Sequence, residues 1–154
     1  TSGIQLAEGS GELRLQSSDP KEHPFLDYRY LQQEFDRQRL RETLRICVAL
    51  GNDPAFKDII EERIEPTDEE LATDEALDEY LYREVTTQQH ISCTNKMGPS
   101  TDPMAVVDQY GKVHGLEGLR VADASIMPNC VRANTNVTTM MIGERVADWI
   151  KQGK

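Results

Sequence analysis

The sequence predicts an α+β domain in which helices pack on a mostly antiparallel sheet. Apolar residues recur at helical spacing in three stretches, residues 31–50, 74–85 and 135–151. Residues 11–16 instead alternate polar and apolar side chains, as half-buried strands do. Between residues 90 and 122 the chain consists of short extended pieces separated by glycine and proline. Together these patterns favour several helices combined with short strands.

The first elements are a short strand and a long helix. Residues 11–16 form the predicted strand, and the turn chemistry of residues 17–20 closes it. We expect the helix to run from Leu31 to Leu50, because Gly51 and Pro54 follow its last apolar residue and terminate it. The apolar stripe of this helix consists of Leu31, Phe35, Leu40, Leu44, Cys47 and Val48.

Two capping signals follow. Asp53 precedes Pro54 as an N-cap residue precedes a proline at the first helical position, which predicts a short helix ending before Pro66. Residues 67–70 match the capping box, in which Thr67 and Glu70 satisfy each other's backbone amides, and a further helix is expected from residue 74 to residue 85. The inward-facing residues of these two helices are expected to be Phe56, Ile59, Ile60, Leu77, Tyr80 and Leu81.

The C-terminal half begins with short extended pieces, at residues 90–93, 105–108, 112–113 and 119–122, and Tyr110-Gly111 indicates a hairpin turn between two of them. The last helix, from about residue 135 to residue 151, is apolar on more than one side, which suggests burial in a body larger than this chain supplies. Its apolar residues are Val137, Met140, Met141, Ile142, Val146, Ala147, Trp149 and Ile150.

Composition excludes several classes of protein. The 154 residues fit one domain at the usual size of about 100 to 200 residues. With 27 acidic and 17 basic residues, the net charge of −10 disfavours binding to nucleic acid or to an anionic membrane surface. We interpret the acidic run 61–79 as a solvated helix face rather than a partner site. No stretch approaches the roughly 18 apolar residues that a membrane-spanning helix needs.

The cysteines and the first residue add two expectations. Cys47, Cys93 and Cys130 are odd in number and widely spaced, which argues against a disulfide framework or a zinc site and favours a reducing, cytoplasmic location. The sequence opens at Thr1 without a methionine or a secretion signal, so we expect a fragment of a longer protein.

Among the three histidines, His90 is the strongest catalytic candidate. His23 stands beside a proline in a polar loop, and His114 lies in a turn. An imidazole titrates near neutrality and can therefore accept and return a proton, although a lone histidine is more often structural. The residues around His90 raise its rank because they form part of a longer series of motifs.

Those motifs occur in a definite order. They are Gly11-Glu-Leu-Arg-Leu-Gln-Ser-Ser-Asp-Pro20 with Leu26-Asp-Tyr-Arg-Tyr-Leu31, Thr87-x-x-His90-x-x-x-Thr94-x-x-Met97-Gly98, Ala105-Val-Val-Asp108, Val113-His-Gly-Leu-Glu-Gly-Leu-Arg-Val-Ala-Asp-Ala-Ser125, and Asn134 ahead of Glu144-Arg145-x-Ala-Asp148. In this order and spacing, nearly end to end, the chain resembles the C-terminal part of the glucose–methanol–choline (GMC) family of flavin oxidoreductases, and within it the choline and other alcohol dehydrogenases.

The resemblance implies a fold and an activity. Residues 1–154 would form the substrate-side C-terminal domain, similar to the FAD-linked reductase C-terminal domain, and about residues 115–154 would pack against an N-terminal FAD-binding domain of the same protein. The reaction implied is oxidation of a small-molecule alcohol to a carbonyl, with hydride transfer to FAD. No Gly-x-Gly-x-x-Gly fingerprint for the adenosine diphosphate part of the cofactor occurs in this sequence, so the fragment alone is expected to be inactive.

The resemblance also implies site residues. By position, His90 corresponds to the family's proton-accepting histidine. Asn134 corresponds to the assisting residue and would donate a hydrogen bond to the developing alkoxide. The flavin would lie against the positive start of the last helix and a neighbouring turn. The cofactor-binding residues implied in this way are Asp123, Ala124, Thr135, Asn136 and Val137, and no metal is implied.

The sequence departs from the family pattern at two positions. The family usually has proline directly after the histidine and directly after the asparagine, whereas this sequence has Ile91 and Thr135. Both loops therefore lose a fixed φ angle and gain an N–H group. Two alternatives stay open: a flavin-containing lyase of the cyanohydrin type on the same scaffold, and a non-catalytic acidic interaction domain.

Overall fold

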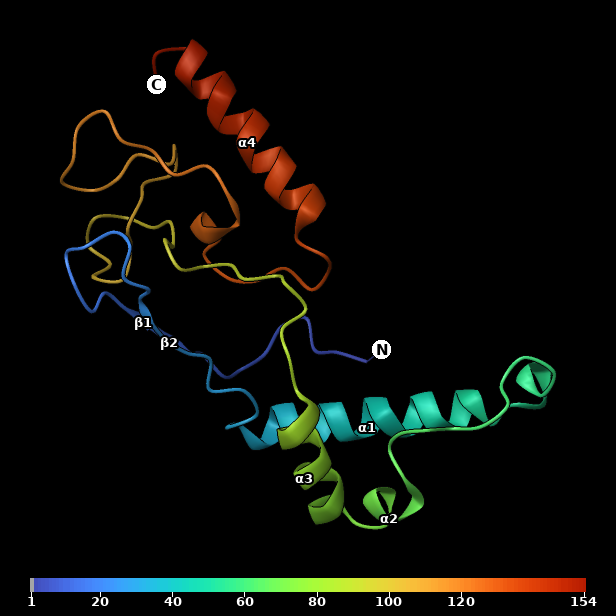
Figure 1. The fold of residues 1–154 in the computed structure, drawn as a ribbon. Helices are drawn as coiled ribbons and strands as arrows, with labels where there is room; N and C mark the ends of the chain where they lie inside the picture. The colour runs from blue at the N-terminus through green and yellow to red at the C-terminus, as the bar shows by residue number, and fades with distance from the viewer. Residues whose placement is uncertain (1) are drawn as a thin grey trace. The chain divides into compact units, whose positions relative to one another are not determined.

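The computed structural model describes residues 2–154 and confirms the α+β class (Figure 1). The chain divides into two compact units between Thr86 and Thr87. The first unit holds the two-stranded sheet and helices α1, α2 and α3, and the second holds helix α4. No helix within residues 2–154 has both the length and the apolar character that crossing a bilayer requires.

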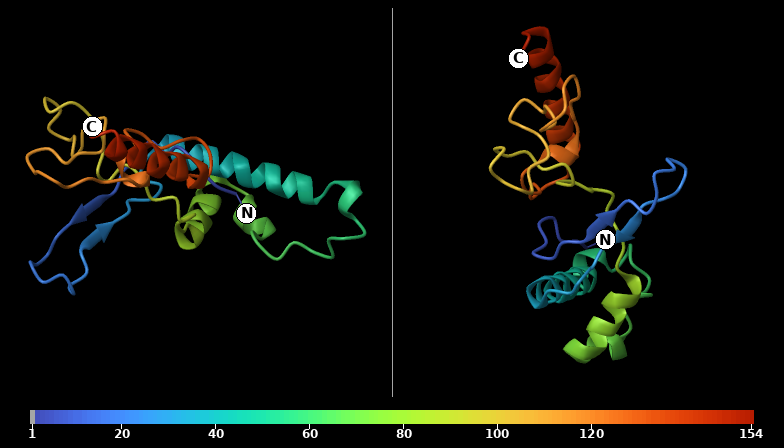
Figure 2. Two further views of the ribbon diagram at one scale, coloured as in Figure 1. Left: turned by 90° about the horizontal axis from the view of Figure 1, so that it is seen from above. Right: turned by 90° about the vertical axis from the view of Figure 1, so that its left-hand side faces the viewer.

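Strands β1 (Glu12–Arg14) and β2 (Phe25–Asp27) form an antiparallel pair, the two blue arrows in Figure 2. In this pair Glu12 lies opposite Asp27. The predicted strand over residues 11–16 is confirmed, although only its centre is paired. The sheet is smaller than expected, since these two strands are the only ladder in the described part of the chain.

Helix α1 (Glu34–Gly51) begins three residues later than predicted. Leu31 has a φ of 60°, in the left-handed region, and therefore cannot join a right-handed helix. Its side chain is nevertheless buried with Leu40 and Leu81, so its place in the apolar stripe is confirmed. Phe35 and Cys47 are exposed, and the stripe is narrower than the periodicity indicated.

The caps predicted after α1 are confirmed, but the burial of one apolar group is not. The Asp53 carboxylate accepts a hydrogen bond of 2.8 Å from the Ala55 amide and starts the 3₁₀ helix η1 (Pro54–Phe56). Phe56, Ile59 and Ile60 are all exposed, contrary to expectation. Because η1 is a single turn, Ile59 and Ile60 lie beyond its end and share no helical face with Phe56.

Helices α2 (Asp68–Leu71) and α3 (Asp74–Glu84) each begin at a threonine cap. The Thr67 hydroxyl accepts from the Glu70 amide at 3.3 Å while the Glu70 carboxylate accepts from the Thr67 amide at 2.8 Å, which confirms the capping box. On α3, Leu77 and Leu81 are buried as predicted, and the partly buried Tyr80 packs against the cluster of Leu31, Leu40 and Leu81.

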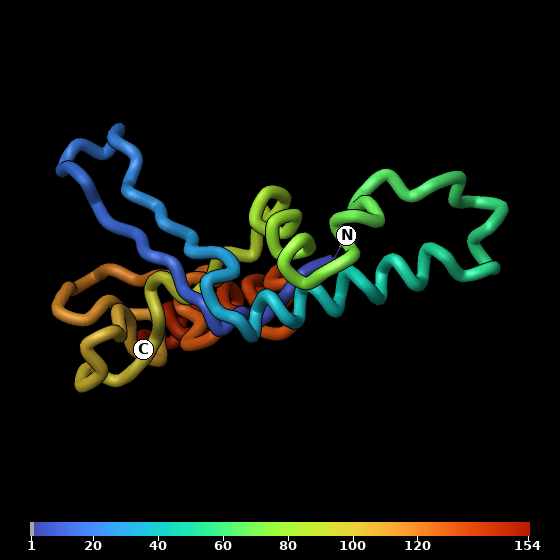
Figure 3. The backbone as a smooth tube through the Cα atoms, turned by 90° about the horizontal axis from the view of Figure 1, so that it is seen from below, coloured from blue at the N-terminus to red at the C-terminus, as the bar shows by residue number. Residues whose placement is uncertain are grey.

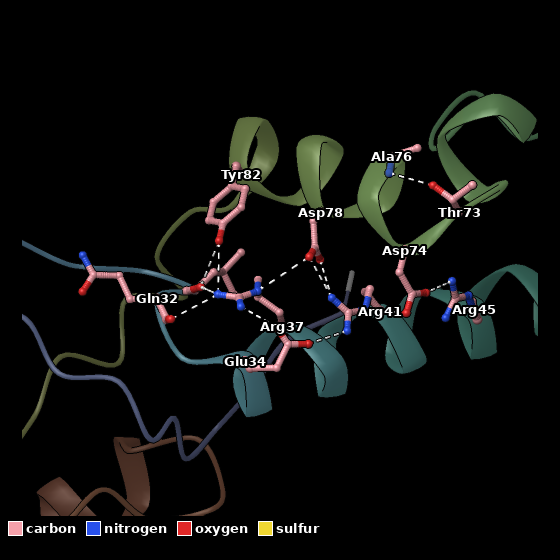
Figure 4. A network of polar contacts seen from close by, with 11 residues as sticks. Gln32, Glu34, Arg37, Arg41, Arg45, Thr73, Asp74, Ala76, Asp78 and Tyr82 are labelled. Atoms are coloured by element: carbon pink, nitrogen blue, oxygen red, sulfur yellow. Dashed lines mark hydrogen bonds and ion pairs between the residues drawn. The ribbon is translucent and has the colours of Figure 1, made fainter.

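Charged side chains join α1 to α3 (Figure 4). The Arg41 guanidinium donates two hydrogen bonds of 2.8 Å to the Asp78 carboxylate and one of 2.7 Å to Glu34. Arg45 donates to Asp74 at 2.5 Å, further along the same pair of helices. Part of the acidic run that we interpreted as a solvated helix face is therefore engaged in ion pairs with α1.

A second buried charge, Asp36, holds the N-terminal segment on α1. Its carboxylate accepts hydrogen bonds from the amides of Glu8, at 3.0 and 3.1 Å, and Gly9, at 2.9 Å, and from Arg39 at 2.6 Å. Burial by itself raises the pKa of Asp36, but the bonds from Gly9, Glu8 and Arg39 outweigh it and leave the pKa below the ordinary value of 3.8.

Substituting Asp36→Asn should therefore destabilise the protein in a pH-dependent way. Since the folded-state pKa is depressed, the carboxylate stabilises the fold above the ordinary pKa of 3.8, and this contribution is lost as the pH falls below that value. Urea unfolding should show a deficit of about 1–3 kcal/mol near neutral pH for the variant, shrinking towards about pH 3. The exposed Asp58→Asn serves as the control. A deficit that stayed constant with pH would contradict the role of the Asp36 charge.

In the second unit, short extended segments surround one core. Val107 makes single bridges with Met97 and Val113 and has no exposed surface. The hairpin turn predicted at Tyr110-Gly111 is confirmed, because the Asp108 amide donates to the Lys112 carbonyl across it at 2.9 Å. Gly111 has a φ of 75°, and a β carbon there would lie 2.6 Å from the Val121 carbonyl oxygen, so this turn requires glycine.

Helix α4 (Asn136–Lys151), the red end of the backbone in Figure 3, packs one face on this core. Ile142 and Val146 are buried with Val107, Ile126 and Met127. Other apolar residues of α4 remain exposed, as the sequence indicated for a helix that is apolar on more than one side. These are Val137, Met140, Met141 and Ile150.

Candidate active site

A hollow of about 530 Å³ opens at the N-terminal end of α4, entirely within the second unit. Three segments line it: residues 89–94, residues 123–125 and the first residues of α4 with Thr135 before them. The first and last of these segments are more than forty positions apart in the sequence, yet side chains from all three line the same hollow. His90 lies in the first of these segments.

Backbone hydrogen bonds hold the His90 segment in place. The amides of Cys93, Asn95 and Met97 donate in turn to the carbonyls of residues 124, 125 and 126, at 3.2, 2.9 and 2.9 Å. The Asn95 side chain adds a bond of 3.0 Å to the Ser125 hydroxyl. These bonds form no regular ladder, and the extended pieces expected at residues 90–93 and 119–122 are not strands. The bonds instead fix the loop that carries His90.

The second lining segment is the 3₁₀ helix η2 (Ala124–Ile126). Asp123 caps it, since its carboxylate accepts from the Ser125 amide at 2.7 Å. Ile126 and Met127, at its end, are buried against α4. The cap and the buried anchor together hold the Asp123-Ala124 turn at the edge of the hollow.

His90 contacts the start of α4 directly. Its Nδ1 atom lies 3.1 Å from the Thr135 hydroxyl oxygen, which is the hydrogen-bond partner that residues 2–154 provide for this ring. Thr135 is buried, and its carbonyl accepts from both the amide and the hydroxyl of Thr139, at 2.9 and 2.8 Å. His90 itself is half-buried, and Nε2 is the nitrogen left for a ligand.

The start of α4 presents a positive electrostatic environment. Thr135 is the N-cap residue but makes no side-chain cap, and the first turn of α4 contains no acidic residue. The first amides of a helix have no intrahelical partners and lie at the positive end of the helix dipole. These amides favour an electronegative group beside Thr135 and Asn136. The charged residue in the lining, Asp123, opposes such a group, although its carboxylate already accepts a hydrogen bond from the Ser125 amide.

The structure brings most of the sequence-predicted residues together and leaves two apart. His90, Asp123, Ala124, Thr135 and Asn136 all line the hollow. Asn134 and Val137 are exposed and do not line it. Val137 retains 71% of its surface, and Asn134 directly precedes the buried Thr135.

Sequence reasoning missed the parts played by Ser125 and Thr139. Ser125 binds Asn95, and Thr139 lies one turn after Thr135 and bonds its carbonyl. The spacing of the two threonines was a usable signal, because residues four apart share a helix face. The other histidines do not compete with His90: Nε2 of His114 lies 3.0 Å from the Gly98 carbonyl, and His23 is exposed. Within residues 2–154, no group of acidic, cysteine and histidine residues has the arrangement of a metal site.

Comparison with known proteins agrees with these features. A family model described as GMC oxidoreductase matches residues 7–143. Among curated proteins, the chain is 41% identical over 149 residues to an oxygen-dependent choline dehydrogenase of Stenotrophomonas maltophilia (strain K279a). It is 44% identical over 149 residues to the protein of the same name from Cronobacter sakazakii (strain ATCC BAA-894). Each match covers 97% of this chain and 26% of the relative, so the chain spans about a quarter of these proteins.

Two solved structures resemble this chain both in fold and in sequence. Pyridoxine 4-oxidase from Mesorbium loti superposes with a TM-score of 0.84 at 28% identity, covering 97% of this chain and 29% of that one. A formate oxidase from Aspergillus oryzae RIB40, in a variant studied for FAD modification, gives a TM-score of 0.87 at 30% identity, covering 96% of this chain and 25% of that one.

Proposed function

This chain belongs to the GMC oxidoreductase family, and we propose that it supplies the substrate side of the active site in an FAD-dependent oxidation of an alcohol to a carbonyl. The observation that carries the proposal is the shared hollow, in which a histidine on one loop meets the uncapped start of a helix. The choline dehydrogenases at 41% and 44% identity support an alcohol as the substrate class.

The residues of the hollow fit one edge of a flavin ring. Flavin presents electronegative atoms around N1 and the C2 carbonyl, and the start of α4 offers hydrogen-bond donors with no competing side-chain cap. We propose that Thr135, Asn136 and Val137 hold this edge through backbone amides at the start of α4, since the Val137 side chain lies outside the lining of the hollow. Asp123 and Ala124 would contact the cofactor from the turn before η2. When bound, the flavin supplies the acceptor for the hydride of the substrate.

The rest of the cofactor would be bound by a part of the protein outside this sequence. No glycine-rich dinucleotide fingerprint occurs among the 154 residues, and the relatives are about four times as long as the matched region. We propose that this part is an N-terminal FAD-binding domain and that residues 115–154 pack against it. The exposed side chains Val137, Met140 and Met141 on α4 support such a contact.

In the proposed mechanism, His90 and Asn134 act on the substrate oxygen. The free Nε2 of His90 takes the hydroxyl proton as the carbon–hydrogen bond breaks, so the substrate loses one proton and one hydride and becomes a carbonyl. The Asn134 carboxamide is not a base. It would donate a hydrogen bond to the substrate oxygen as negative charge develops on that oxygen. Asn134 is exposed and does not line the hollow, but it directly precedes Thr135, the partner of His90, and this adjacency supports the proposed role.

Anaerobic mixing of the full-length protein with alcohols tests the proposal. With purified protein carrying FAD, choline and a panel of simple alcohols, at least one alcohol should abolish the visible absorbance of the oxidised flavin. One equivalent of the corresponding aldehyde or ketone should form for each flavin reduced. A protein that purified without flavin and did not take it up would instead be a non-catalytic interaction module. Cleavage of cyanohydrins without loss of flavin absorbance would identify the lyase.

A further inference from the structure

We infer that Thr135 is a positioning residue that holds His90 in the tautomer with its proton on Nδ1, so that Nε2 keeps a free lone pair. The catalytic consequence rests on the function proposed above. The inference itself rests on the 3.1 Å contact between the Thr135 hydroxyl and Nδ1 of His90. Within residues 2–154 this hydroxyl has no other hydrogen-bond partner, and it does not cap α4.

The threonine hydroxyl is diverted from its usual task. A threonine at an N-cap normally accepts a hydrogen bond from an amide two or three residues into the helix. Two other helices of this chain show that arrangement: Thr67 caps α2 and Thr73 caps α3, both with extended backbone, at ψ of 170° and 164°. Thr135 has a ψ of −16° and makes no such bond. Its hydroxyl therefore faces His90 instead of its own helix.

The environment of Thr135 makes it a rigid partner. A β-branched side chain has few accessible χ1 values, and the Thr135 carbonyl is held by two bonds from Thr139. Thr135 is also buried, with 7% of its surface exposed. The oxygen that faces Nδ1 therefore has little freedom to move away from the ring.

Only one direction of this hydrogen bond suits a base at Nε2. A neutral imidazole carries one proton, so a proton on Nε2 would leave that nitrogen without a lone pair. If Nδ1 donates to the Thr135 hydroxyl oxygen, Nε2 is free to accept a proton. The same bond persists after the proton is taken up, because the imidazolium donates from both nitrogens. With the opposite direction, Nδ1 would accept from the Thr135 hydroxyl and the ring proton would lie on Nε2, which could then take no proton from the substrate.

The test uses full-length protein with bound FAD and isotope-labelled histidine. Nitrogen chemical shifts of the imidazole rings report which nitrogen carries the proton, and a His90→Gln sample assigns the signals of His90. The wild type should show His90 with its proton on Nδ1. Thr135→Val, which keeps the shape and removes the hydroxyl, should shift His90 towards the other tautomer. Thr135→Ser, which keeps the hydroxyl, should retain the wild-type signal.

Kinetics provide the second measurement. Thr135→Val should slow the rate of flavin reduction by about 10-fold, the scale of one lost neutral hydrogen bond, and Thr135→Ser should stay within about 3-fold of wild type. A wild-type His90 with its proton on Nε2 would overturn the inference, as would a Thr135→Val protein with unchanged tautomer and rate. If Thr135→Val does not fold, the wild-type and Thr135→Ser spectra still decide the tautomer.

Failure of this inference is distinguishable from failure of the proposed function. The tautomer is determined from the nuclear magnetic resonance spectrum, and this measurement requires no turnover. If replacing His90 left flavin reduction unchanged, the catalytic proposal would fail while the spectrum still reported whether Thr135 sets the proton position. If His90 proved essential and the spectrum showed the other tautomer, only the role of Thr135 would be lost.

Discussion

Replacement of His90 by alanine or glutamine in the full-length protein is expected to slow flavin reduction by about 100-fold or more, the usual scale for a positioned acid–base group. Without the imidazole, the hydroxyl proton of the substrate has no acceptor at the position that His90 occupies beside Thr135. Because an alcohol is a poor hydride donor until its proton is leaving, both steps should slow together. Stopped-flow mixing with substrate under anaerobic conditions measures the rate directly.

A matched histidine substitution provides the control. His23 is exposed in the loop between β1 and β2, and His23→Gln should reduce its flavin at the wild-type rate. The flavin content and visible spectrum of each variant should be recorded, so that a lost cofactor is not mistaken for slow chemistry. A His90→Ala protein that bound flavin and reduced it at the wild-type rate would remove His90 from the mechanism.

Replacement of Asp78 by alanine should lower the free energy of unfolding by about 2 kcal/mol or more, because the buried Arg41 guanidinium loses this carboxylate as its partner. The Arg41 side chain is only 8% exposed and loses two hydrogen bonds of 2.8 Å when the Asp78 carboxylate is removed (Figure 4). Glu34 still binds Arg41, which limits the loss. Urea unfolding of the full-length protein measures the change.

A double substitution separates the cost of an unpaired charge from the value of the ion pair. In Arg41→Met with Asp78→Leu, no buried charge lacks a partner, and much of the stability lost in Asp78→Ala should return. The exposed pair of Arg14 and Glu12 supplies the comparison, and Arg14→Ala should have no measurable effect on unfolding. If Asp78→Ala were as stable as wild type, the network between α1 and α3 would not contribute to the fold.

Local elements were predictable from the sequence wherever short-range chemistry decides the backbone. The caps at Asp53 and Thr67 and the turn at Gly111 depend on residues within a few positions of one another, and all three are confirmed. The start of α1 and the extent of the sheet were not predictable in this way. Leu31 has a left-handed backbone and is buried against Leu81, fifty positions away, and the His90 loop bonds residues 124–126. These contacts join residues distant in sequence.

Thr135 shows the same limit at the site. Its place before a helix indicates a cap, and local chemistry would direct its hydroxyl to its own helix, as at Thr67 and Thr73. The folded chain instead sets an αR backbone there and brings His90 within 3.1 Å of the hydroxyl. Sequence motifs indicated that both residues belong to the site, but not that they bind each other.

By itself, the sequence determined the secondary-structure class, the caps, the excess of apolar residues on the last helix and the motifs that point to the family. Each of these depends on residue types at short spacing, where steric and hydrogen-bonding preferences act without the rest of the fold. The tertiary structure alone decided which side chains share the hollow, because packing of Ile126 and Met127 against α4 brings residues 90 and 135 together. Contacts between residues so far apart in the chain depend on the sum of the packing, and no short motif contains them.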